Sequence, residues 1–268
     1  MNGSFRRMLA FEATLHDRLV NRKVVFPYGT GLFNDEIPFK YDINFLHVEG
    51  SPKVTAEQLA SEADRLMDDA IYEHRRVVVD DEDLGSDLQP GFDELGWKHS
   101  RYLWMEHVRP PSREARAGIA FEMDNADHIL TKKIFNRREP FSARDDVVVQ
   151  MARSDEMIAA ATLRRSFAAR AGGVIASICE TYSDGTIGQI EDVATLEEHR
   201  GKGLGTEVVL EALASLQRAG HELIFLVADD DDWPKQMYEN LGFEGVGVTY
   251  QFIRLPDLAQ EATEQRTT

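Results

Sequence analysis

The sequence has little of what an oxidising compartment or a membrane requires. It contains 1 cysteine in 268 residues, so an internal disulfide cannot form. No apolar run approaches the ~20 residues of a transmembrane helix. Residues 5–8 begin an amphipathic pattern rather than a signal sequence. These absences predict a soluble, cytoplasmic protein, and Cys179 is expected to be buried and inert.

Positive charge is also scarce. Lysine and arginine number 30 against 47 aspartates and glutamates, which gives a formal net charge of −17. Because this surplus repels phosphate backbones and anionic lipid, it argues against nucleic acid and membrane partners. It favours a cationic or amine-bearing partner, with ordinary solubility or salt adaptation as the alternative. The length exceeds one average domain, so we expect two domains.

Glycine, in contrast, is concentrated between an apolar strand predicted over residues 187–195 and a helical pattern that begins at Leu204. The segment reads Arg200, Gly201, Lys202, Gly203, Leu204, Gly205. Its alternating glycines remove the Cβ atoms that would keep a ligand away from the backbone. The first amides of the new helix have no intrahelical acceptor, and Arg200 and Lys202 add positive charge. The segment therefore predicts a pyrophosphate cradle.

Two common phosphate-binding loops do not fit this segment. A Walker loop requires a Lys-Ser or Lys-Thr pair after the glycines, and none follows here. A dinucleotide fingerprint requires a third glycine where this chain has Thr206 or Val208, depending on the first glycine counted. The remaining pattern, Arg-x-x-Gly-x-Gly, resembles the acetyl-CoA pyrophosphate loop of the GNAT superfamily of N-acetyltransferases. A glycine-rich helix start without a ligand is the alternative.

The order of predicted elements extends this resemblance over residues 112–256. The pattern predicts helices over 127–138 and 145–160, a hairpin over 164–170 and 174–182, the strand 187–195, a helix from 204 to Gly220, a buried strand over 221–228, a short helix from Pro234, and a strand over 246–255. The resemblance implies an α/β fold, with a central mixed β-sheet flanked by helices and a catalytic domain over 112–256. Residues 257–268 are expected to be a polar tail.

An internal repeat is visible in the first half of the chain. Residues 92–97 (FDELGW) align with 238–243 (YENLGF), and each hexapeptide precedes a predicted strand, the first over 100–108. The strands 41–48 and 75–79 and the helix 55–70 supply further counterparts. Residues 1–110 thus resemble a second GNAT-like domain, and the chain two tandem GNAT-like domains. Chance similarity of short turns is the alternative.

The N-terminal half is expected to be degenerate. Residues 49–55 (EGSPKVT) stand where the cofactor loop belongs, with one glycine and a proline that removes an amide donor. This half is therefore predicted to bind no CoA. Residues 110–113 (PPSR) are expected to form the linker between the domains.

The resemblance implies an acetyl-CoA-dependent N-acetyltransferase in which a primary amine attacks the thioester directly. It assigns Tyr238 to protonation of the departing thiolate. It assigns the pantetheine arm to the backbone of Val193, Ala194 and Thr195. It assigns the pyrophosphate to Arg200, Gly201, Lys202, Gly203, Leu204, Gly205 and Thr206. The implied acceptor bears an amine, and no metal is expected.

Glu191 is our candidate general base, because strand alternation places it on the same face as Val193 and Thr195. Some relatives that acetylate lysine carry a glutamate where this chain has Gln189. A water relay or an already neutral amine is therefore an alternative to Glu191.

Two further departures from the family pattern concern the cofactor and metals. Asp231 stands where relatives commonly have a pantetheine-binding asparagine. His199 and His221 lack partners at metal-ligand spacing and are expected to be surface residues. The competing function is a non-catalytic acyl-CoA-binding sensor or interaction module.

Overall fold

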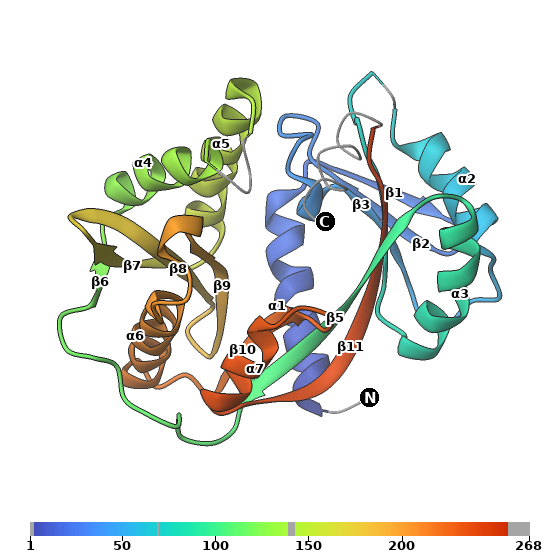
Figure 1. Ribbon diagram of the computed structural model, residues 1–268. Coiled ribbons are helices and arrows are strands. Elements are labelled where there is room, and N and C mark those ends of the chain that lie inside the picture. The colour runs from blue at the N-terminus through green and yellow to red at the C-terminus, as the bar shows by residue number, and fades with distance from the viewer. Residues whose placement is uncertain (1–2, 69, 139–142, 257–268) are drawn as a thin grey trace. The chain divides into compact units, whose positions relative to one another are not determined.

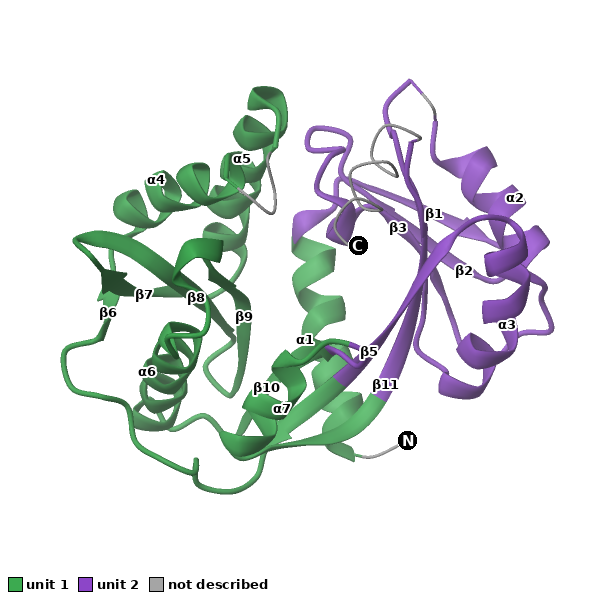
Figure 2. Ribbon diagram, in the orientation of Figure 1, with its two compact units in different colours: residues 1–18, 104–228, 232–247 green, residues 19–103, 229–231, 248–268 purple. Residues whose placement is uncertain are grey.

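The computed structural model of the protein describes residues 3–68, 70–138 and 143–256, and it shows a mixed α/β fold (Figure 1). The predicted tail over 257–268 lies outside the described residues. The chain divides into two compact units (Figure 2): unit 1 contains 1–18, 104–228 and 232–247, and unit 2 contains 19–103, 229–231 and 248–268. No helix in the described ranges is long and apolar enough to cross a membrane.

Unit 1 contains most of the elements predicted for the C-terminal domain, the N-terminal helix and the strand β6, which was not predicted. They are α1 (Gly3–Leu19), β6 (Ala120–Met123), α4 (Asn125–Asn136), α5 (Asp145–Ala161), β7 (Arg165–Ala171), β8 (Val174–Ser183), β9 (Ile187–Thr195), the 3₁₀ turn η2 (Glu197–His199), α6 (Leu204–Arg218), β10 (Leu223–Asp229) and α7 (Pro234–Asn240). The strand order is β5-β10-β9-β8-β7-β6, where β5 (Lys98–His107) contributes its last residues. β9 and β10 are parallel, and β6 to β9 pair antiparallel.

The sheet of unit 1 is a middle layer, with α6 on one face of β7 to β9 and α4 and α5 on the other (Figure 1). Cys179 of β8 donates its S–H to the carbonyl oxygen of Val208 in α6 at 3.2 Å. The next residue, Glu180, accepts a bond from Lys132 of α4 at 3.1 Å. Neighbouring strand residues point to opposite faces, so these two contacts identify the two faces. Cys179 is buried, which confirms the expectation from the sequence.

Helix α1 is an integral part of unit 1. Phe5 packs against Trp104 with ring centroids 5.6 Å apart, and Phe11 packs against Phe225 of β10 at 5.8 Å. Met8, one turn from each phenylalanine, is fully buried. The amphipathic pattern at the N-terminus therefore covers apolar surface that is built mainly from the second half of the sequence.

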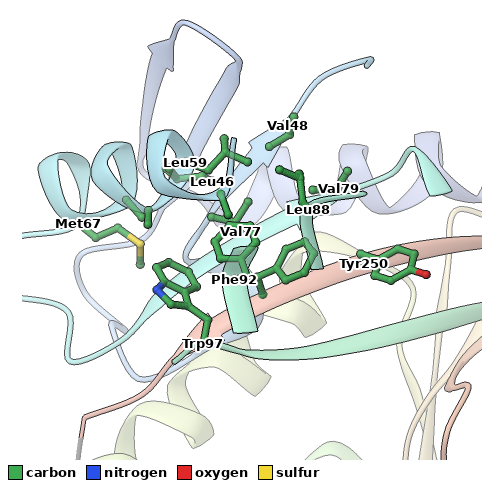
Figure 3. Packing of buried hydrophobic residues seen from close by; sticks show 14 of the residues in the cluster. Leu46, Val48, Leu59, Met67, Val77, Val79, Leu88, Phe92, Trp97 and Tyr250 are labelled. Atoms are coloured by element: carbon green, nitrogen blue, oxygen red, sulfur yellow. The ribbon is translucent and has the colours of Figure 1, made fainter. Parts of the chain in front are cut away.

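Unit 2 is built from the first half of the sequence and the end of the last strand. Its elements are β1 (Arg22–Phe26), β2 (Gly29–Phe33), the 3₁₀ turn η1 (Tyr41–Ile43), β3 (Phe45–Val48), α2 (Ala56–Leu66), β4 (Arg75–Val79) and α3 (Glu82–Glu94). The strand order is β1-β2-β3-β4-β11-β5, and residues 250–254 of β11 (Phe243–Arg254) pair antiparallel with β4. Leu59, Val77 and Phe92 lie in its core, which Figure 3 shows from close by.

Several local features of unit 2 differ from the sequence prediction, among them helix α3, which was not predicted. The strand predicted over 41–48 is the turn η1 followed by β3, because the Asn44 side-chain amide donates to the carbonyls of Ile37 and Lys40 at 3.1 and 2.9 Å. The helix predicted over 55–70 ends at Leu66. The hairpin of β1 and β2 was not predicted.

The final strands of the two repeats, β5 and β11, are each divided between the two compact units. Gly96 and Gly242 both adopt left-handed backbone, with φ of 74° and 93°, and they begin β5 and β11 in the same way. Yet residues 104–107 of β5 belong to unit 1, and residues 248–254 of β11 belong to unit 2. The compact units therefore do not follow the predicted limits at 110 and 112.

Candidate functional site

The predicted cradle forms the turn from β9 into α6. Gly201 and Gly203 have φ of 71° and 75°, which side-chain-bearing residues rarely adopt. Gly203 is the N-cap of α6, and no side chain caps this helix. The amides of the first turn therefore have no intrahelical acceptor. A Cβ on Gly205 would lie 3.4 Å from Oγ1 of Thr195, so the loop is also closely packed against β9.

A cavity of about 800 Å³ opens in front of this cradle, within unit 1. This volume is within the usual range for a bound small molecule or cofactor. The predicted residues that line it are Val193, Ala194, Thr195, Arg200, Gly201, Gly203, Leu204, Gly205, Thr206 and Tyr238. Lys202, Glu191 and Asp231 are not among the lining residues, whereas Asp232 is. The structure thus gathers most of the predicted site in one cavity.

β9 and β10 separate beside the cavity. Their parallel register runs from Ile187 opposite Leu223 to Ile190 opposite Leu226, whereas β9 itself continues to Thr195. On its other edge β9 still pairs with β8, and Thr195 lies opposite Ser177. The backbone groups that residues 193–195 direct toward β10 are therefore outside the β9–β10 ladder. These are the backbone groups to which the resemblance assigned the pantetheine arm.

Two arginines beside the cradle were missed by the sequence analysis. Glu207, in the first turn of α6, is fully buried. Its carboxylate accepts the Arg116 backbone amide at 2.8 Å, Nε of Arg116 at 2.7 Å and a guanidinium nitrogen of Arg113 at 2.7 Å. Burial favours the neutral acid, but the bonds to Arg116 and Arg113 outweigh it and lower the pKa of Glu207. The expected linker is therefore docked on α6, and its residues Ser112 and Arg113 line the cavity.

The two cations within the loop hold the turn that precedes the cradle. Nε of Arg200 donates to the carbonyl oxygen of Thr195 at 3.4 Å. Nζ of Lys202 donates to the carbonyl oxygen of Glu198 at 2.9 Å and lies 3.3 Å from Nδ1 of His199. His199 also lines the cavity. Arg113 and Arg200 line the cavity, whereas Arg116 and Lys202 are not among its lining residues.

Tyr238 lies on α7 and faces the cavity, with 7% of its surface exposed. Burial, followed by the negative charge of Glu191, raises the pKa of its hydroxyl above the ordinary value for tyrosine. The hydroxyl is therefore protonated at neutral pH and able to donate a proton. Because Glu191 contributes to this shift, the two residues that the sequence analysis chose for catalysis are electrostatically coupled.

A β-bulge places Glu191 differently from the prediction. Glu191 lies opposite Glu180 and Ala194 opposite Ile178, so two residues of β9 oppose Cys179 alone. Asp192, in the bulge, has φ of 55° and is the non-glycine residue with positive φ in the described part of the chain. The bulge interrupts strand alternation, and it puts Glu191 and Thr195 on opposite faces. The expected shared face is therefore wrong, because it assumed an unbroken strand.

A buried ion-pair cluster lies behind the bulge. The Lys132 ammonium pairs with Asp192, and it lies 3.1 Å from Glu180 and 3.7 Å from Asp155. Burial lowers the pKa of Lys132, but these three carboxylates outweigh burial and raise it. His128, Asp155 and Glu180 are close enough together to hold a metal ion. Lys132 already supplies a cation to them, so we describe the group as an ion-pair cluster that holds the bulge.

The corresponding place in unit 2 has different chemistry. A cleft of about 570 Å³ lies at the start of α2, lined by Lys53 but also by Asp81, Asp83 and Asp87. Thr55 and the third residue of α2 form a capping box, so a first-turn amide is already bonded to the Thr55 side chain. This cleft lacks the glycine turn and carries negative charge.

Comparison with known proteins identifies the fold. Residues 168–252 match the FR47-like protein family. The sequence matches none of the curated proteins with which it was compared. Among solved structures, a conserved protein of unknown function from Staphylococcus epidermidis is 16% identical, with 88% of this chain and 94% of that chain covered at a TM-score of 0.67.

Two similar structures carry family names. A GCN5-related N-acetyltransferase from Kribbella flavida is 18% identical, with 94% of this chain and 95% of that chain covered at a TM-score of 0.59. A tandem GNAT protein from the clavulanic acid biosynthesis pathway is 15% identical, with 85% and 79% covered at a TM-score of 0.52. At these identities the likeness concerns the fold. The chain therefore has the GNAT fold, with a match to the FR47-like protein family over residues 168–252 and a structural likeness to a tandem GNAT protein over most of its length.

Proposed function

We propose that the protein is an acetyl-CoA-dependent N-acetyltransferase that acts on a primary amine. The observation that carries this proposal is a single cavity in a GNAT fold, lined by both the glycine cradle and the buried, protonated Tyr238. Acetyl-CoA would supply the acetyl group as an activated thioester. The implied product is an acetamide, and the thioester C–S bond breaks as the new C–N bond forms.

The cradle residues fit the anionic part of this molecule. The unpaired first-turn amides of α6 and the positive end of its dipole suit a pyrophosphate. Arg113 and Arg200 also line the cavity, where a guanidinium can add charge-assisted bonds to a pyrophosphate. The backbone of residues 193–195, outside the β9–β10 ladder, can bind the amide groups of an extended pantetheine arm.

Two side chains carry the proton transfers in this proposal. The Tyr238 hydroxyl donates a proton to the departing sulfur, and Glu191 accepts a proton from the acceptor amine. Glu191 lies on the face of β9 that also bears Glu180, opposite to α6. The acceptor is therefore proposed to approach from the face covered by α4, α5 and α1.

One observation favours a second candidate function. Glu191 does not line the cavity that contains the cradle. A protein that retained the cradle without a correctly placed base would bind acyl-CoA and not turn it over. An acyl-CoA-binding sensor or interaction module is therefore the alternative.

The two functions are distinguished by incubating the purified protein with acetyl-CoA and a panel of primary amines. The proposal predicts thiol release that depends on the amine, together with a mass increase of the amine by one acetyl group. Calorimetric binding of acetyl-CoA without amine-dependent thiol release would support the sensor. Absence of acetyl-CoA binding would contradict both functions.

A further inference from the structure

An exposed tryptophan lies in the cavity that contains the cradle. Trp233 exposes 66% of its surface and is one of the residues that line this cavity. Other large apolar side chains in the described ranges are also exposed, but among them Trp233 is the one that lines the cavity. Single exposed apolar residues are common on protein surfaces, whereas an aromatic ring in a concave site is typical of a contact with a ligand.

Local structure does not account for a tryptophan at this position. Trp233 is the N-cap of α7, and its side chain caps no backbone amide. Asparagine, aspartate, serine or threonine would add a capping bond there. The ring also gains little from burial, because most of it is exposed. A residue that gains neither local stability nor burial is expected to have a functional role.

The neighbouring carboxylate indicates which part of acetyl-CoA this ring suits. Asp232 also lines the cavity and is exposed, and its Oδ1 accepts the backbone amide of Trp233 at 2.7 Å. A carboxylate repels phosphate groups. Adenine is uncharged, has a flat aromatic face, and carries an amino group that can donate to a carboxylate. The ring and the carboxylate together therefore suit a purine base better than a pyrophosphate.

The position of Trp233 relative to the other proposed contacts agrees with this choice. Tyr238, the proposed acid for the sulfur, follows Trp233 by five positions, which is about 7 Å along a helix axis. The proposed function assigns the pantetheine arm to the backbone of residues 193–195 and the pyrophosphate to the first turn of α6. Adenosine is the part of the cofactor that these groups leave without a partner.

We propose that Trp233 stacks on the adenine base of acetyl-CoA, with Asp232 beside it to accept a bond from the amino group of the base. This inference rests on the proposed function, because it requires acetyl-CoA to occupy the cavity. It adds a contact that recognises the nucleotide end of the cofactor. The protein should therefore prefer an acyl-CoA to an acyl group carried on a pantetheine arm without adenosine.

The test is calorimetry of Trp233→Ala and Trp233→Phe with two ligands. One ligand is acetyl-CoA, and the other is S-acetyl-4′-phosphopantetheine, which has the same acyl arm but no adenosine. Because Trp233 is exposed, its truncation removes little packing and the variant should fold. Loss of stacking in Trp233→Ala should weaken acetyl-CoA binding by roughly 5- to 150-fold. The affinity for S-acetyl-4′-phosphopantetheine should stay unchanged.

Trp233→Phe retains an aromatic ring, so its acetyl-CoA affinity should remain within about threefold of wild type. Leu163→Ala is the matched control, because Leu163 is 65% exposed and does not line the cavity. It should leave both affinities unchanged. Unchanged acetyl-CoA affinity in a folded Trp233→Ala protein, or equal weakening for the two ligands, would overturn the proposal.

Tryptophan fluorescence reports the contact directly. Trp97 and Trp104 are 3% and 4% exposed, so Trp233 is the tryptophan that a ligand in the cavity can reach. Acetyl-CoA should quench the emission of the wild type, because a stacked base quenches an indole. The emission of Trp233→Phe should not change on binding. Equal quenching of the wild type and Trp233→Phe would contradict stacking on Trp233.

These titrations also separate the inference from the proposed function. If the wild type binds acetyl-CoA but releases no thiol with any amine, the enzyme proposal fails, and the affinities of Trp233→Ala still decide the adenine contact. If the wild type and Trp233→Ala bind acetyl-CoA equally, the adenine contact fails and the cofactor site stands. Absence of acetyl-CoA binding to the wild type would overturn both.

Discussion

Nε of Arg116 lies 2.7 Å from Oε1 of Glu207, although 91 positions separate the two residues in sequence. This contact fastens the segment after β5 to the first turn of α6. Because Glu207 is fully buried, the arginine bonds replace the water that the carboxylate loses on folding. The same segment contributes Arg113 to the cavity. Glu207 therefore both contributes to the stability of unit 1 and holds Arg113 at the cavity.

We expect Glu207→Gln to lower the free energy of unfolding by about 1–3 kcal/mol at pH 7, the cost of losing a charged hydrogen-bond partner. The folded-state pKa of Glu207 is lowered. Its stabilisation is therefore fully present above the unfolded value of about 4.3 and is lost as pH falls through the folded pKa. Urea denaturation at pH 7 and at lower pH should show the difference from wild type shrinking on acidification.

Glu211→Gln is the matched control, since Glu211 forms a partly exposed ion pair with Arg218 on the same helix. Such pairs contribute about 0–1 kcal/mol. If Glu211→Gln lowered the free energy of unfolding as much as Glu207→Gln does, the buried pair would have no special role. A Glu207→Gln effect that does not depend on pH would also contradict this account.

The cradle is tested by Gly203→Val. The glycine has φ of 75° at the N-cap of α6, where a Cβ would strain the backbone and obstruct an approaching anion. We expect calorimetry to show acetyl-CoA affinity reduced by more than about tenfold. Gly173→Val introduces comparable backbone strain in the β7–β8 turn, at φ of 84°, and should leave the affinity unchanged. A folded Gly203→Val protein with wild-type affinity would remove the loop from the cofactor site.

The contrast between the two units predicts one acetyl-CoA per chain. In the described part of the chain, the loop of residues 200–205 has left-handed glycines at the start of a helix, whereas the unit 2 cleft has a capping box and three aspartates. Calorimetric stoichiometry should therefore be one. A value of two would contradict the description of the N-terminal half as degenerate.

Tyr238→Phe tests the proposed acid without changing the packing of the ring. Acetyl-CoA affinity should be retained, while turnover should fall by roughly 10²- to 10⁴-fold, as expected for loss of general acid catalysis. Tyr250→Phe, at a buried tyrosine of unit 2, is the control and should retain turnover. Turnover of Tyr238→Phe within about threefold of wild type would exclude Tyr238 from the chemistry.

Much of the cradle could be predicted because its determinants are local. The period of apolar residues and the glycine spacing specified β9 as residues 187–195 and the start of α6 at Leu204, and the structure has both limits. The repeat was also visible, since Gly96 and Gly242 each require left-handed backbone in equivalent turns.

The remaining features depend on contacts between distant residues. The bulge at Asp192 is held by Lys132, 60 positions away, and no local pattern in β9 indicates it. Arg113 is held at the cavity by its ion pair with Glu207, which lies far away in the sequence. Locally, Pro110 and Pro111 indicated only a linker. A glutamate among the apolar residues of the first turns of α6 was the one available signal, because a buried carboxylate requires a cationic partner. The division of β5 and β11 between the units had no signal in the sequence, since both strands follow equivalent turns.

The most direct test of the account is a crystal structure of the protein with bound CoA. We predict one CoA in unit 1, with its pyrophosphate at the amides of the first turn of α6, its pantetheine arm along residues 193–195, and its sulfur near the Tyr238 hydroxyl. CoA bound with its pyrophosphate elsewhere, or in the cleft of residues 51–57, would contradict the central claim.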